Sequence, residues 1–145
     1  MPYVTVLWLG EKALREISTF KHDEEEFQLS FNEHFSSAKK QLEEINDLLL
    51  SFHREEIDLK GLRIAVNEKR EELDRLLFNF DDIGLPTKVN TVQTENLNEL
   101  SDLIASINNV AVVCSNESYN DRALIQLISK YSQDASAAHD RIILE

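Results

Sequence analysis

The sequence has 145 residues, of which 42% are hydrophobic and 29% are charged, a composition typical of one folded domain and not of a disordered tail. It holds only three glycines and two prolines, which argues against a turn-rich all-β sandwich, and its single cysteine excludes an internal disulfide framework. Acidic residues outnumber basic ones 27 to 15, so the net charge of −12 disfavours binding to nucleic acid and to anionic membranes.

Residues 1–22 begin with an apolar run, Tyr3–Leu9, that Gly10 closes. Its Val, Thr, Tyr and Trp residues favour a short β-strand, which a short helix would follow. The run is too short to span a membrane, and it lacks the basic start and the small-residue cleavage site of a signal peptide. Because no export signal is found and Cys114 stands alone, we expect a cytoplasmic protein.

Residues 23–80 carry the strongest pattern of the chain. Asp23 and Glu26 have the spacing of a capping box and predict a helix start. Apolar residues then recur every seven positions from Phe31 to Phe80, and a second series completes a coiled-coil-like 3-4 spacing in the first half. The first series is Phe31, Ala38, Ile45, Phe52, Leu59, Val66, Leu73 and Phe80, and the second is Phe35, Leu42 and Leu49.

The second series fails beyond Phe52, and this leaves two interpretations of the segment. One is a continuous helix of roughly 57 residues, about 86 Å long. The other is two antiparallel helices with a turn near residues 53–61, whose two arms face one core. We favour the continuous helix slightly, because no Pro, Asn or Gly precedes Gly61 in that stretch.

A linker over residues 81–93 and a helical hairpin over residues 94–145 are predicted next. Gly84 and Pro86 stop the long segment, and Thr94 is the expected N-cap of the following helix. Polar residues 115–120 have the composition of a turn between two helices with 3-4 apolar spacing. The run Val110–Cys114 is also compatible with a strand paired to residues 3–9, and residues 142–144 offer a similar alternative.

Chemistry-bearing motifs are not found. The four histidines do not follow the Glu-x-x-His spacing of di-iron bundles, and one cysteine cannot build a thiolate zinc site. With glycine only at positions 10, 61 and 84, the chain holds no glycine-rich phosphate loop. We therefore expect no cofactor, no metal, no small-molecule substrate and no enzymatic activity.

The sequence thus predicts a single, mainly α-helical domain in which a long helix or helical hairpin packs with a C-terminal αα-hairpin. We expect a non-catalytic interaction or scaffold protein that binds a protein partner or a second copy of itself through its apolar seam, because a rod of this length leaves apolar area uncovered. The residues expected at this interface are Phe31, Phe35, Leu42, Ile45, Leu49 and Phe52; an intramolecular core is the alternative role of each. The other hypothesis is a small acidic inhibitor or nucleic-acid mimic that binds a basic protein.

Overall fold

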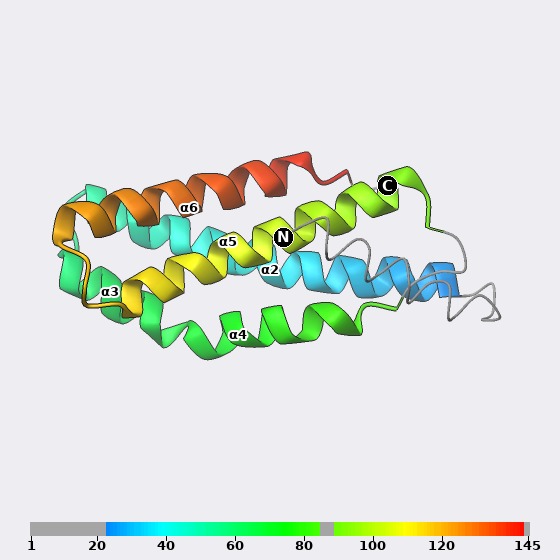
Figure 1. The fold of residues 1–145 in the computed structure, drawn as a ribbon, viewed down its shortest axis with the longest axis horizontal. Coiled ribbons are helices and arrows are strands. Elements are labelled where there is room, and N and C mark those ends of the chain that lie inside the picture. The colour runs from blue at the N-terminus through cyan, green and yellow to red at the C-terminus, as the bar shows by residue number, and fades with distance from the viewer. Residues whose placement is uncertain (1–22, 85–88, 144–145) are drawn as a thin grey trace.

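The computed structural model describes residues 23–84 and 89–143, and these form a bundle of α-helices (Figure 1). The predicted mainly α-helical class is confirmed, and the described residues include no strand. Figure 1 shows four arms that run in alternating directions along the long axis: α2, then α3 with α4, then α5, then α6. The elements are α2 (Asp23–His53), α3 (Leu59–Glu68), α4 (Arg70–Asn79), the 3-10 turn η1 (Phe80–Asp82), α5 (Thr91–Ser115) and α6 (Asp121–Arg141).

The continuous helix expected over residues 23–80 is wrong, because the chain leaves the helical path after His53. Glu55 adopts a left-handed backbone conformation with φ of 61°. Its N–H donates to the carbonyl of Phe52 at 3.1 Å, and the N–H of Glu56 donates to the carbonyl of Ser51 at 2.9 Å. These are the two bonds of a Schellman motif, which ends a helix and is usually built on glycine.

Asp58 starts the second arm. Its backbone is extended, and its carboxylate accepts the N–H of Gly61 at 2.7 Å, which satisfies a donor that the first turn of α3 leaves open. A side chain at Gly61 would place a Cβ 3.2 Å from that carboxylate oxygen, so glycine leaves the cap room. The reversal therefore depends on the Asp58 cap and on Glu55, which adopts a left-handed conformation that glutamate seldom adopts.

The return arm is interrupted once, at Lys69, between α3 and α4. The N–H of Lys69 donates to the carbonyl of Val66 at 3.0 Å, a three-residue spacing tighter than that of an α-helix. Both halves stay against α5: Arg63 donates to the carbonyls of Cys114 and Asn116, and buried Asn108 donates to the carbonyl of Leu73 at 3.1 Å. The Arg63 bonds satisfy carbonyls that the end of α5 leaves open, and the Asn108 bond ties α4 to α5.

The C-terminal part differs from the expected boundaries at its start. Helix α5 begins at Thr91 and not at residue 94, and its cap is Asn90 and not Thr94. Asn90 and Gln93 form a complete capping box, with bonds of 2.7 and 3.0 Å. The turn predicted over residues 115–120 separates α5 from α6, whose cap is Asn120.

The strand alternatives are not observed where they can be tested. Val110–Cys114 lies within the last turns of α5, and most of its side chains are buried in the bundle. Ile142 ends α6 in an extended conformation without forming a strand. The expected N-terminal strand, Tyr3–Leu9, lies outside the described residues, as does Leu144.

One core joins all four arms, with α5 in contact with each of the other long helices. The seven-residue series supplies half of the buried apolar residues of the first two arms. Phe31, Ala38 and Ile45 are buried on α2, and the same spacing buries Val66, Leu73 and Phe80 on the return arm. Both arms thus present one face to one core, and this preserves the period across the turn.

Candidate functional site

The six residues predicted to form an interface belong to this core. Phe31, Phe35, Leu42 and Ile45 are buried, while Leu49 and Phe52 are partly buried and pack against the core. The structure thus gives them, within one chain, the intramolecular role that the sequence left open. Their role in an interface with a partner stays a prediction, and an exposed apolar surface has to be sought elsewhere.

An aromatic row lies at the same end of the core. The Phe31 ring is 6.1 Å from that of Phe27 and 6.3 Å from that of Phe35, measured between centroids. The His139 ring of α6 stacks on Phe35 at 5.4 Å, and its Nδ1 contacts the carboxylate of Asp140 at 2.9 Å. This row joins α2 to α6 and is a packing feature, because its three phenylalanines are buried in the core.

A polar groove separates α2 from α3 and α4. Two adjoining hollows of about 390 Å³ and 530 Å³ lie along it, and Lys40 and Glu72 line both of them. At its centre Lys69, from the break between α3 and α4, forms an ion pair with Glu44 of α2. Buried Gln41 donates to Glu72 at 2.5 Å and accepts from Lys69 at 3.5 Å.

His34 lines the same groove near the end of α4. Its Nδ1 lies 2.7 Å from the carbonyl oxygen of Ser30, and its Nε2 lies 2.9 Å from that of Asn79, the last residue of α4. Carbonyl oxygens only accept, so a ring nitrogen that carries a proton donates to the carbonyl oxygen it faces. His34 thereby ties the end of α4 to α2, and its ring is engaged in structure.

The polar groups at the centre of the groove hold the two arms together and are satisfied by one another, so this cluster has the character of a structural network.

Cys114 has no nucleophilic setting: it is buried near the end of α5, and burial raises the pKa of its thiol to about 11. Within residues 23–84 and 89–143, no group of three or more His, Cys, Asp or Glu residues is placed to hold a metal ion.

The strongest candidate for a binding surface lies on the outer side of α4. Phe78 is 81% exposed and its neighbour Leu77 is 52% exposed. The other large exposed apolar residues of the described chain stand singly on separate turns, so this is its one adjacent pair; they are Leu29, Leu50, Ile64, Val112, Tyr119 and Ile143. Isolated exposed apolar residues are common, and this adjacent pair is the feature of the described surface that departs most from that pattern.

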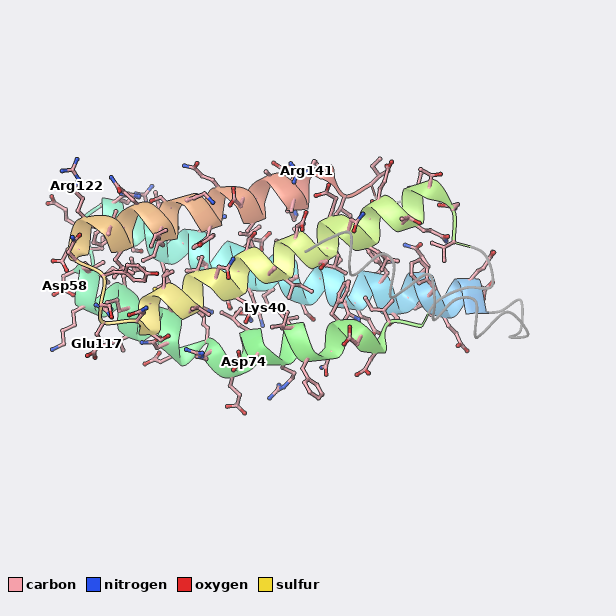
Figure 2. The ribbon with its side chains drawn as sticks, viewed as in Figure 1. Lys40, Asp58, Asp74, Glu117, Arg122 and Arg141 are labelled. Carbon is pink, nitrogen blue, oxygen red and sulfur yellow. The ribbon has the colours of Figure 1, made fainter. Side chains whose placement is uncertain are left out.

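Carboxylates surround this pair. Asp74 lies one helical turn before Phe78, and Asp81 and Asp82 of η1 lie one turn after it; all three are exposed. Figure 2 shows Asp74 on the side of α4 that faces away from the other helices. We call Asp74, Leu77, Phe78, Asp81 and Asp82 the α4 face.

The α4 face is not among the interface residues predicted from the sequence, although the sequence holds a signal for it. The seven-residue series assigns Leu73 and Phe80 to the core and gives Leu77 and Phe78 no place in it. Two apolar residues that do not belong to the core series of a helix are candidates for an external contact.

Comparison with known proteins adds no family assignment. No protein-family model matches the chain, and no curated protein and no solved structure matches it either. Among the described residues, no helix is long and apolar enough to cross a membrane.

Proposed function

We propose that this chain is a non-catalytic protein-interaction module, and that the α4 face is the surface through which it binds its partner. The observation that carries the proposal is the exposure of Phe78, at 81%, beside Leu77, at 52%. Aromatic side chains dominate the energetics of protein interfaces because they bury a large area with few rotatable bonds. An exposed phenylalanine on a helix otherwise covered by charge is therefore the expected anchor of a contact.

The location of the pair supports this role. Leu73, Leu76 and Phe80 already bury the inner side of this segment, so Leu77 and Phe78 are not required for the core. His34 and Asn108 hold α4 through the carbonyls of Asn79 and Leu73, which keeps the outer side in a fixed orientation. A pre-oriented anchor lowers the entropy lost when a partner binds.

Site-specific photo-crosslinking tests the proposal. The photoreactive residue p-benzoylphenylalanine replaces Phe78 in one variant and Leu50, an exposed leucine of α2, in the control. In the producing cells we expect an adduct with another protein from position 78 only. Excess unlabelled chain should suppress this adduct, and excess Phe78→Asp chain should not. Equal adducts from both positions, or suppression by both competitors, would overturn the proposal.

A further inference from the structure

The charges around Phe78 indicate what kind of partner fits the α4 face. Asp74 lies one α-helical turn before Phe78, and Asp81 and Asp82 follow it in the 3-10 turn η1, so exposed carboxylates lie on both sides of Phe78 along the axis of α4 and η1. The C-terminal end of α4 adds the negative partial charge of its last carbonyl groups. An apolar anchor is thus set within a negative field.

The nearest cation does not cancel this field. Arg75 lies one turn before Phe78, and its guanidinium pairs with Glu71 at 3.6 Å. These two charges neutralise each other, which leaves the aspartates to set the sign of the α4 face. A partner that covers Phe78 must therefore bring positive charge to its rim, because an uncharged or acidic rim would leave carboxylates desolvated or repelled.

This requirement selects among the classes of partner. A second copy of the chain brings its own net charge of −12 and an identical acidic rim, so a symmetric contact through this face places like charges together. Nucleic acid and anionic membranes are repelled for the same reason. A basic protein segment with an apolar face is the complementary occupant.

We propose that the α4 face binds a basic protein segment whose Lys or Arg side chains contact Asp74 and Asp82 while its apolar side chains cover Phe78. This inference rests on the proposed function and specifies its partner. Binding of this kind combines an apolar anchor with electrostatic steering, so it weakens both with salt and with loss of the ring.

The test uses the full chain, labelled with ¹⁵N, and a defined probe: a helical peptide of leucine and lysine with one apolar face. The control peptide has glutamate in place of lysine. We expect the lysine peptide to shift the amide resonances of residues 74–82, and the glutamate peptide to leave them unchanged. Binding should weaken at least about tenfold between low and high salt, as screening of exposed charges requires.

Matched variants separate a local contact from general attraction to an acidic protein. The double variant Asp74→Asn with Asp82→Asn, and separately Phe78→Ser, should each lower the affinity for the lysine peptide at least about fivefold. Glu43→Gln with Glu117→Gln changes the net charge equally at exposed sites outside the α4 face, and should leave the affinity within about twofold. Equal weakening by both double variants, or resonance shifts confined to other helices, would overturn the inference.

The two proposals fail in different ways. A crosslink from position 78 to a partner without a basic surface, insensitive to salt, overturns the inference and leaves the proposed function standing. A crosslink from position 78 to a second copy, or to residues 1–22 of the same chain, overturns both.

Discussion

The polar cluster between α2 and the return arm gives the sharpest test of how this bundle is held together. Lys69 is the residue at the break between α3 and α4, and its side chain is only 18% exposed. It pairs with Glu44, which is 39% exposed, and also donates to Gln41. We expect Lys69→Met and Glu44→Gln each to lower the free energy of unfolding, and the two changes to be strongly non-additive.

The expected coupling lies between two limits. Fully exposed pairs contribute about 0.2–1 kcal/mol, whereas removing one partner of a buried pair costs about 3–5 kcal/mol. Because Glu44 is more than one third exposed, solvent screens the pair, and we expect a coupling energy of about 1 kcal/mol. Lys69→Met alone should cost more than Glu44→Gln alone, because it also removes a donor from buried Gln41.

Urea unfolding of the two single variants and the double variant measures this coupling. The matched control is the pair Arg75 and Glu71, whose side chains are 64% and 88% exposed and which lie four residues apart on α4. Its coupling should be about 0.3–0.5 kcal/mol and should disappear in high salt. A Lys69–Glu44 coupling no larger than that of the control would refute the reasoning that the groove stabilises the reversed arms.

Three further predictions concern the turn, a desolvated carboxylate and the thiol. Glu55→Gly should raise the free energy of unfolding, measured by urea titration, by about 0.5 kcal/mol. Glycine removes a left-handed strain of about 1–2 kcal/mol, but it also increases the entropy of the unfolded chain. Glu55→Val should lower the free energy of unfolding. Desolvation, with repulsion from Glu99, raises the pKa of Asp102, so the folded state binds this proton more tightly than the unfolded state. Asp102→Asn should therefore raise the melting temperature at neutral pH, and the gain should shrink as the pH falls through the raised carboxyl pKa; a gain that grows toward acid would contradict this sign. Because the pKa of Cys114 is raised to about 11, its labelling by iodoacetamide at pH 8 should be roughly a hundredfold slower in the folded chain than in urea, and equal rates would contradict its burial.

The seven-residue apolar repeat and the composition predict which segments of this chain are helical better than they predict the turns that connect these segments. Phe31 and Phe80 lie at the two ends of one heptad series, and the residues of that series do face a core. A repeat of seven does not record whether the chain reverses between two of its members, because both arms of a hairpin can present the same face. The reversal depends on the backbone of Glu55, and no residue preference indicates a left-handed glutamate.

Other differences have local causes that a closer comparison of residues could have found. Asp58 is a good N-cap, and it starts α3 without the Pro, Asn or Gly on which the prediction of a turn relied. Asn90 competes with Thr94 as the cap of α5 and is favoured because Gln93 completes the box. Val110–Cys114 is β-branched and apolar, but burial on the central helix outweighs its strand propensity.

The α4 face shows a limit of a different kind. Sequence patterns distinguish core positions from polar ones, and Phe78 follows neither pattern. Only the packing of Leu73 and Phe80 shows that the ring between them points outward and is left bare. The candidate site therefore became visible once the core residues were known, and not before.

The central claim is that residues 23–80 fold back on themselves, so that their apolar seam is the interior of one chain and contact with a partner is left to the α4 face. Nitroxide labels at exposed positions 39 and 74, in a Cys114→Ala background diluted with unlabelled chain, measure this by double electron–electron resonance. The bonds from Gln41 to Glu72 and from His34 to Asn79 place these positions on facing arms, so we expect a distance below about 30 Å. A continuous helix separates them by about 52 Å, and a distance near that value would contradict the account.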